Sequence, residues 1–272
     1  DAVQRLITWC KEHRPELVPV LERIKELRMW SRIKSTYLDG YMRHIDPDTK
    51  CIHPDILQLS TKTGRMSCRN PNLQNMPRRA NDPTGIRSCI KAPDGHLILS
   101  ADYSQVELRA SAFLSHDKRM CNIYREGGDI HAATASVILG TSYAEETNSL
   151  APDHKEHRAV AKTVNFSAIY GTSAQGLQKT LAQAGIQKSL HECESILRNL
   201  TRGFEGLSEW QQQVKAEASL HRYSETWLGR RRYLPDIAST DWKLRPAAER
   251  QAVNTPVQGT AADIIKLAMT RI

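Results

Sequence analysis

Apolar positions recur along most of the chain with the period of an α-helix. Within residues 17–33 the apolar side chains form a stripe along one face, which predicts a helix. That stripe consists of Leu17, Val20, Leu21, Ile24, Leu27 and Ile33. The same period predicts further helices over residues 106–114, 129–139, 153–170, 189–199 and 205–222. We expect Asp129 to be an N-cap, because its carboxylate can accept a hydrogen bond from a free N–H group of the first turn.

Three stretches depart from this period. Residues 37–81 are polar and punctuated by Gly, Pro, Asn and Asp, which indicates irregular structure. Residues 96–101 form a short apolar run after a turn signal, and this pattern predicts a buried strand. Residues 227–234 fit a hairpin or a strand followed by a turn. The sequence therefore predicts an α+β fold that is mostly helical, with a long helical insertion between two parts of a sheet-bearing core.

The last helix has a start signal of its own. Thr255, Pro256 and Gln258 fit the N-cap, N1 and N3 positions of a capping box, so we expect this helix to begin at Thr255. Apolar-periodic sequence runs directly from Asp1 and up to Ile272, so both ends look like cuts through helices. We therefore expect a fragment of a longer protein.

Composition narrows the class of protein. The chain has 272 residues, 40% of them hydrophobic and 25% charged, which is enough for one large domain or two smaller ones. A net charge of +8 favours a polyanionic partner. The six cysteines are scattered without a C-x-x-C pair, which argues against a zinc site or a disulfide scaffold and favours a reducing compartment. No apolar run approaches the ~20 residues that span a bilayer, so we expect no membrane partner.

A carboxylate follows the predicted strand at Asp102. Hard cations such as Mg²⁺ prefer oxygen ligands, so a carboxylate in this place suits a magnesium-dependent site. The alternative is that Asp102 merely ends the strand as a turn residue. The segment by itself favours neither interpretation.

Two cationic and two aromatic residues are regularly spaced within the predicted helix over 153–170. Arg158, Lys162, Phe166 and Tyr170 are spaced by four residues, which places them along one side of a helix that Gly171 would end. Two cations followed by two aromatic rings could hold a triphosphate at one end and a base at the other. The alternative, a solvated basic turn followed by core aromatics, is the better interpretation for an isolated helix.

The polar segment 63–79 is rich in amide and guanidinium donors. Such groups reach phosphates and base edges, although an ordinary loop capped by Asn side chains has the same composition. The run Arg230, Arg231 and Arg232 has the same two interpretations, as phosphate contacts or as a solvated surface.

Six segments together resemble motifs of family A DNA polymerases, of the bacterial DNA polymerase I type, in the family's order and at compatible spacing. They are TGRMSCRNPNLQNMPRR, DYSQVELRASAFLS, GGDIHAATAS, RAVAKTVNFSAIYG, TWLGRRRYLPDI and AAERQAVNTPVQGTAADIIKLAM. The resemblance implies a right-hand architecture, with a palm of antiparallel sheet and helices and a mostly helical fingers domain, both incomplete. It assigns residues 1–36 to the end of the thumb, 37–120 to the first part of the palm, 121–235 to the fingers and 236–272 to the second part of the palm.

The resemblance also implies an activity. A primer 3′-hydroxyl would attack the α-phosphate of a deoxynucleoside triphosphate, and pyrophosphate would leave. Two Mg²⁺ ions would assist, with the Asp102 carboxylate and the Tyr103 carbonyl as ligands. The implied partners are primer-template DNA and deoxynucleoside triphosphates. We expect a monomer in the cytoplasm of a bacterium or a phage-infected cell, with an organelle as the alternative.

The remaining site residues follow from the resemblance. Arg158 and Lys162 would bind the triphosphate, and Lys162 would also protonate the pyrophosphate. Glu107 would be the steric gate that rejects ribonucleotides. Further nucleotide contacts would come from Phe166, Tyr170, Gln105 and His131. Primer and template contacts would come from Arg65, Asn72, Gln74, Asn75, Arg250, Asn254 and Gln258.

The sequence departs from the family pattern in two ways. Ser167 stands where many members have Gly. The motif with the second metal-binding Asp, a His-Asp-Glu turn, does not follow the predicted last helix, so we expect these 272 residues alone to bind metal weakly and to be inactive. A single-subunit RNA polymerase is one alternative, against which Glu107 and Phe166 argue. A non-catalytic DNA-binding protein on a polymerase scaffold is the other.

Overall fold

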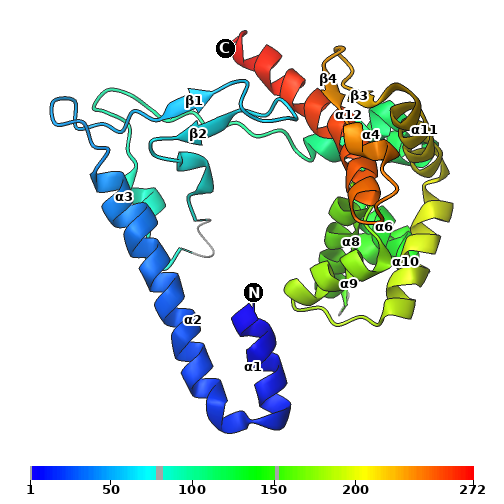
Figure 1. Ribbon diagram of the computed structural model, residues 1–272, viewed down its shortest axis with the longest axis horizontal. Helices are drawn as coiled ribbons and strands as arrows, with labels where there is room; N and C mark the ends of the chain where they lie inside the picture. Colours follow the sequence, from blue (N-terminus) through cyan, green and yellow to red (C-terminus); the bar gives the residue numbers. More distant parts are fainter. Residues whose placement is uncertain (1, 78–81, 151–152) are drawn as a thin grey trace. The chain divides into compact units, whose positions relative to one another are not determined.

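The computed structural model describes residues 2–77, 82–150 and 153–272. The chain divides into two compact units (Figure 1). The first contains residues up to Ser60 and those from Met66 to Ala101, and the second contains Thr61–Arg65 and Asp102–Ile272. Nearly all of the candidate site residues belong to the second unit.

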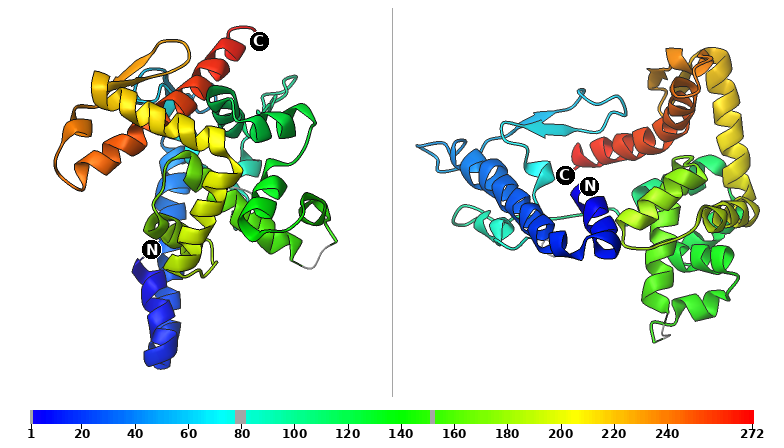
Figure 2. Two further views of the ribbon diagram at one scale, coloured as in Figure 1. Left: turned by 90° about the vertical axis from the view of Figure 1, so that its right-hand side faces the viewer. Right: turned by 60° about the horizontal axis from the view of Figure 1, so that its bottom comes forward.

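The first unit begins with a hairpin of two helices, which lie side by side in Figures 1 and 2. These are α1 (Ala2–His13) and α2 (Val18–Arg32), joined by the 3₁₀ turn η1 (Pro15–Leu17). A π-helical stretch, η2 (Ile33–Leu38), leads into α3 (Asp39–Met42). The helix predicted over 17–33 is therefore present.

The apolar stripe of α2 is mostly exposed. No residue of α2 is buried, and Leu27 is 68% exposed. Two helices packed along one line can cover only part of each other's surface, and the other extensive contacts of α2 are with its chain neighbours η1 and η2. The small core of this unit forms further along the chain, where Ile33, Tyr37, Tyr41 and Ile86 pack together.

The irregular segment of the first unit contains a short hairpin that the sequence did not predict. Strands β1 (Asp55–Leu57) and β2 (Ser67–Arg69) pair antiparallel, with Asp55 opposite Arg69. Two 3₁₀ turns follow, η3 (Leu73–Asn75) and η5 (Ile86–Cys89).

The prediction of a buried strand over residues 96–101 is wrong. These residues form no regular structure, and Leu97 and Leu99 are 97% and 81% exposed. A strand needs a neighbour to pair its backbone groups, and none of the described strands lies beside this run. An apolar sequence is therefore not sufficient to bury it.

The second unit is a bundle of helices with one small hairpin. The elements before the hairpin are α4 (Val106–Ser115), α5 (Lys118–Arg125), α6 (Ile130–Leu139), α7 (Tyr143–Thr147), α8 (His154–Ile169), α9 (Ala174–Gln183), α10 (Leu190–Gly203) and α11 (Glu205–His221). The hairpin and the last helices are β3 (Tyr223–Glu225), β4 (Arg231–Tyr233), η6 (Pro235–Ala238) and α12 (Leu244–Met269). All five helices predicted for this region are present within a few residues, and the predicted hairpin is present as β3 and β4. Asp129 caps α6, because its carboxylate accepts a hydrogen bond from the His131 N–H at 2.9 Å.

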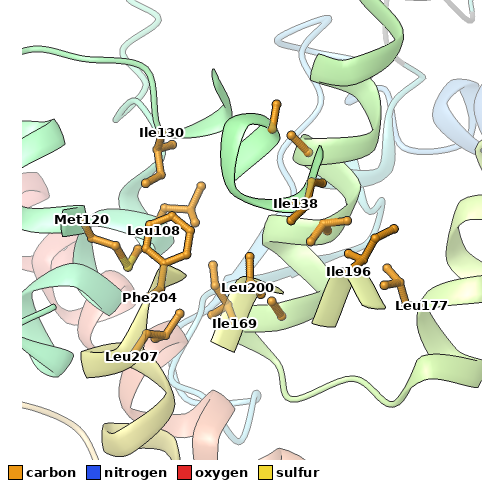
Figure 3. Close-up of a cluster of buried hydrophobic side chains, with 14 of the residues drawn as sticks. Leu108, Met120, Ile130, Ile138, Ile169, Leu177, Ile196, Leu200, Phe204 and Leu207 are labelled. Atoms are coloured by element: carbon orange, nitrogen blue, oxygen red, sulfur yellow. The ribbon is translucent and has the colours of Figure 1, made fainter. Parts of the chain in front are cut away.

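A large apolar core holds most of this bundle together (Figure 3), and a smaller one contains Ala218, Leu234, Ile237, Ala248 and Ala252. The large core includes Leu108 of α4, Ile130 of α6, Ile169 of α8 and Leu200 of α10, all within 7% of complete burial. Full burial of such a side chain stabilises the fold by about 1.5–3 kcal/mol relative to exposure. Because this core fixes α4, α6 and α8 against one another, it sets the positions of the side chains on their outer faces.

The last helix begins at Leu244, well before the predicted start at Thr255, and Pro256 lies in its interior. Proline has no N–H, so the carbonyl of Ala252 loses its helical partner. The hydroxyl of Ser224 in β3 donates to that carbonyl at 2.7 Å. Thr255 does not cap a helix, since its hydroxyl donates back to Gln251 O at 2.7 Å. The start predicted from the capping pattern is therefore wrong, because a neighbouring strand satisfies the carbonyl that Pro256 leaves free.

Candidate active site

Helix α8 carries Lys162 and Phe166 on the side that faces away from the core, whereas Tyr170 at its C-cap packs against the core. Val160 and Val164 on its inner face are buried, whereas Lys162 and Phe166 on its outer face are exposed. The inner residues thus hold the helix in place while the outer residues stay accessible. Phe166 is 39% exposed, which excludes the alternative that it is a core aromatic.

A hollow of about 440 Å³ lies along the outer face of α8. It is lined by Lys162, Thr163, Phe166, Ser167, Tyr170, Thr172 and Thr180. Its volume lies within the roughly 300–1,000 Å³ that is usual for small-molecule sites. An ammonium group and two aromatic rings on one wall suit a ligand that combines negative charge with a flat ring.

Three residues predicted for the site meet at the carboxylate of Glu107. This carboxylate lies in the first turn of α4 and is buried. One of its oxygens accepts a hydrogen bond from the Arg65 guanidinium, and the other accepts one from the Tyr170 hydroxyl. A buried carboxylate needs such partners to offset the loss of hydration. The structure therefore joins Arg65, Glu107 and Tyr170 from three distant segments into one hydrogen-bonded group.

The loop that carries Arg65 lies against Arg230, for which the sequence left open a phosphate contact or a solvated surface cation. Gly64 has a φ of 81°, and a Cβ built there would lie 2.3 Å from the guanidinium carbon of Arg230. Arg230 in turn donates to Asp263 Oδ1 at 2.8 Å and to the carbonyl of Gly259 in α12. Arg230 therefore packs between this loop and α12, and a side chain at position 64 would displace its guanidinium group.

Asp129 pairs with Arg158 across α6 and α8. Its Oδ2 accepts a hydrogen bond from Arg158 Nη1, while its Oδ1 caps the helix. Burial by itself would raise the pKa of Asp129, but the hydrogen bonds from Arg158 and from the His131 N–H outweigh burial and lower it. The sequence identified Asp129 only as an N-cap, because nothing in the spacing of 29 residues between the two groups indicates an ion pair.

His131 lies behind the outer face of α8 and is buried. Its pKa is lowered chiefly by burial, and Arg158 and Lys162 lower it further while Asp129 opposes them. The ring is therefore neutral at neutral pH. Its Nδ1 lies 2.9 Å from the amide nitrogen of Asn165.

The residues predicted to bind metal are the least organised part of the site. Asp102 and Tyr103 are exposed in irregular backbone, and among the described residues no hydrogen bond or ion pair involves Asp102. The described residues contain no group of three or more His, Cys, Asp or Glu side chains that could hold a metal ion. A carboxylate and a carbonyl are ligands of the type that Mg²⁺ prefers, but they form only part of a site. Gln105, just after them, accepts a hydrogen bond from the Tyr124 hydroxyl at 3.2 Å.

Three residues predicted to contact DNA share one side of α12. Arg250, Asn254 and Gln258 are spaced by four residues and so lie along one side of the helix, next to the fully buried Val253 and Val257. The side-chain oxygen of Asn254 is buried and has no hydrogen-bond partner in the part of the chain that the structure describes. An acceptor left without a partner is costly, so this oxygen is ready to accept a hydrogen bond from a bound ligand or water.

The other predicted DNA contacts lie on the surface of the first unit. Asn72 caps η3 by accepting a hydrogen bond from the Gln74 N–H at 3.0 Å, as an ordinary polar loop would require. Gln74 and Asn75 are exposed. The next cations of this segment, residues 78 and 79, lie outside the described residues.

The fold and the site together define a polymerase domain. A solved structure of the POL domain of Pol1 from M. smegmatis, in complex with DNA primer-template and dNTP, matches with a TM-score of 0.83 and 34% identity. The match covers 98% of this chain and 44% of that chain. The mostly helical α+β fold with small antiparallel sheets is thus the fold of a polymerase domain.

The model of DNA polymerase family A matches residues 7–272, so the chain belongs to this family. The thermostable DNA polymerase I of Thermus filiformis is 43% identical over 254 residues, and the DNA polymerase I of Pseudomonas aeruginosa is 39% identical over 249 residues. These matches cover 93% and 92% of this chain, which spans 29% and 26% of the two relatives. Neither an RNA polymerase nor a non-catalytic protein is favoured by these relatives. None of the described helices is long and apolar enough to cross a membrane.

Proposed function

We propose that this chain is part of a template-directed DNA polymerase, which adds deoxynucleotides to a primer 3′-hydroxyl and releases pyrophosphate. The observation that carries this proposal is the outer face of α8, where Lys162 and Phe166 line an open hollow of about 440 Å³. Membership of DNA polymerase family A supports the same reaction. A role in DNA replication or repair is consistent with relatives named DNA polymerase I.

In this proposal α8 binds the incoming nucleotide. Arg158 and Lys162 neutralise the triphosphate, and Lys162 gives a proton to the leaving pyrophosphate. Phe166 and Tyr170 contact the sugar and the base. Proton transfer from a positioned side chain contributes roughly 10²–10⁴-fold to a rate, so Lys162 has a larger role in the chemical step than Arg158.

Glu107 selects the sugar. Its carboxylate is fixed from two sides by Arg65 and Tyr170, so it cannot swing aside to make room. A rigid carboxylate next to the sugar crowds a 2′-hydroxyl and leaves space for a deoxyribose. Gln105 and His131 would complete the contacts with the nucleotide.

Mg²⁺ would bind at Asp102 and at the carbonyl of Tyr103. Two such ions about 3.5–4 Å apart stabilise the attacking and leaving oxygens in enzymes of this type. Asp102 is the one carboxylate that we assign to them. We therefore expect the 272 residues on their own to bind Mg²⁺ weakly and to extend no primer.

The DNA would lie against Arg65, Asn72, Gln74 and Asn75 and against the α12 side with Arg250, Asn254 and Gln258. The net charge of +8 supports this, because release of counterions favours binding of a polyanion. Thumb, palm and fingers would follow the division given by the sequence. We propose that the protein acts as a monomer in the cytoplasm, in keeping with its bacterial relatives.

Primer extension by the whole protein tests this proposal. Lys162→Ala should lower the rate by about 10²–10⁴-fold, because it removes both a phosphate contact and the proton donor. Lys179→Ala is the matched control, since Lys179 is exposed on the neighbouring helix α9 and outside the hollow. Equal rates for the two variants would contradict the proposal.

A further inference from the structure

A buried chain of hydrogen bonds joins α6 to α8 directly behind the candidate nucleotide site. Thr134 Oγ1 lies 2.8 Å from Asn165 Oδ1, and Asn165 Nδ2 lies 2.9 Å from His131 Nδ1. The exposed fractions of Thr134, Asn165 and His131 are 0%, 5% and 5%. Water therefore has little access to these groups. The donors and acceptors among them must pair mainly with one another.

The structure places the nitrogen of the Asn165 amide toward His131, and in this orientation the chemistry of an amide fixes the direction of the bond. An amide nitrogen donates and cannot accept, so Nδ1 of the imidazole must be the acceptor. An accepting Nδ1 carries no proton. The neutral ring then carries its proton on Nε2, for which the described residues provide no hydrogen-bond partner.

Burial and the two neighbouring cations lower the pKa of His131 and so favour the neutral ring. Burial is the main cause of its lowered pKa, and Arg158 and Lys162 add to this effect against the opposing charge of Asp129. A neutral ring can donate a single N–H, so the tautomer decides what the ring offers to a ligand.

We propose that Asn165 is a positioning residue that holds His131 in the tautomer with the proton on Nε2, so that the ring offers an N–H donor to the triphosphate. The inference rests on the proposed function in one respect, namely that a triphosphate lies beside Arg158 and Lys162. In that case a neutral donor adds a hydrogen bond to a phosphate oxygen without a third positive charge next to two cations. The opposite tautomer would direct a lone pair at the phosphate.

The opposite tautomer has a definite structure, so the two arrangements can be distinguished. If the Asn165 amide were turned over, the Thr134 hydroxyl would donate only to Ile130 O, which lies 2.9 Å away. Asn165 Nδ2 would then donate to Thr134, and His131 Nδ1–H would donate to Asn165 Oδ1. Heavy atoms hardly move between the two arrangements, so the position of the proton has to be measured directly.

Nitrogen NMR of protein labelled with ¹⁵N-histidine measures this position without a nucleotide. His131→Gln assigns the signal by its disappearance. We expect the His131 signals of one protonated and one unprotonated nitrogen, with the proton on Nε2. A proton on Nδ1 overturns the inference, whatever the activity of the protein.

Asn165→Asp reverses the bond with little change in shape, because a carboxylate accepts and does not donate. We expect it to move the His131 proton to Nδ1 and to raise the KM for the deoxynucleotide by about tenfold or more in primer extension by the whole protein, with a smaller change in kcat. Asn199→Asp is the matched control, since Asn199 is half-buried in α10 and its Nδ2 donates to Ile138 O.

The two readouts separate the inference from the proposed function. A proton on Nε2 together with a raised KM supports the inference. A proton on Nε2 with the KM of Asn165→Asp equal to that of Asn199→Asp overturns the role toward the nucleotide. Failure of the proposed function itself would show differently, as an unchanged rate in Lys162→Ala. The measurement on unsubstituted protein decides the tautomer even where a variant fails to fold.

Discussion

The residues of the candidate site fall into two groups that are held in very different ways. Glu107, Arg158 and His131 each have a hydrogen-bond partner on another element, and the core beneath them is closely packed. Asp102 and Tyr103 are exposed in irregular backbone, next to the exposed run 96–101. The first group is positioned by contacts between helices of one unit. The second follows residues 96–101, which form no strand, so no packed element positions Asp102 and Tyr103.

The largest effect on activity should come from a substitution in the second group, which has the fewest contacts. Asp102→Ala should lower primer extension by the whole protein by roughly 10³-fold, because loss of a metal ligand removes several kcal/mol of stabilisation of the transition state. The free energy of unfolding should stay the same, since the side chain is exposed and makes no hydrogen bond or ion pair within the described residues. Urea denaturation measures the second quantity. A loss of stability that accounts for the loss of rate would contradict this separation.

Two matched Leu→Ala variants compare the contribution to stability of the core below the first group with that of the exposed run next to the second group. Leu108→Ala should lower the free energy of unfolding by about 2–5 kcal/mol, because Leu108 is 1% exposed in the core below the site. Leu97→Ala should change it by less than about 0.5 kcal/mol, because Leu97 is 97% exposed. Similar costs in denaturant titrations would show that residues 96–101 are packed in the protein.

Loss of the hydrogen bond at the interior proline of α12 should have a smaller effect on the free energy of unfolding. Ser224→Ala should cost about 1–3 kcal/mol, since it leaves the carbonyl of Ala252 buried without a donor. Adding Pro256→Ala restores the N–H that the helix lacks, so the double variant should recover part of the loss. A double-mutant cycle measured by thermal unfolding checks this coupling, and strictly additive effects would contradict it.

The smallest effect concerns the ion pair between Asp129 and Arg158. The pKa of Asp129 is lowered in the folded protein, so its charge contributes stability above its ordinary value of 3.8, and this contribution is lost as pH falls through the lower folded value. The difference in unfolding free energy between the protein and Asp129→Asn should therefore be constant near neutral pH and shrink below about pH 4. Denaturant titrations at several pH values measure it. A difference that grows in acid would mean that the pKa is raised instead.

The sequence predicted the parts of this fold that local chemistry decides. The helix over 153–170 and the cap at Asp129 both appear, because spacing and capping are properties of a few neighbouring residues. Contacts between distant segments could not be read in this way. The partner of Arg158, the support of His131 by Asn165 and the packing role of Arg230 all depend on how helices cross.

The errors have the same origin. The run 96–101 is apolar enough for a buried strand but needs a neighbour, and Thr255 has the pattern of a cap but lies inside a helix. In the second case the deciding group was Ser224, some thirty residues earlier in the chain. Asn165 could have been suspected from its place in a buried position of a helix, where a polar side chain needs a partner.

A crystal structure of the whole protein with primer-template DNA and a deoxynucleoside triphosphate tests the central claim most directly. The account predicts that the triphosphate lies against Arg158 and Lys162 on the outer face of α8, with the sugar next to Glu107. A nucleotide bound elsewhere, with these three side chains in contact only with solvent or with protein, would contradict it.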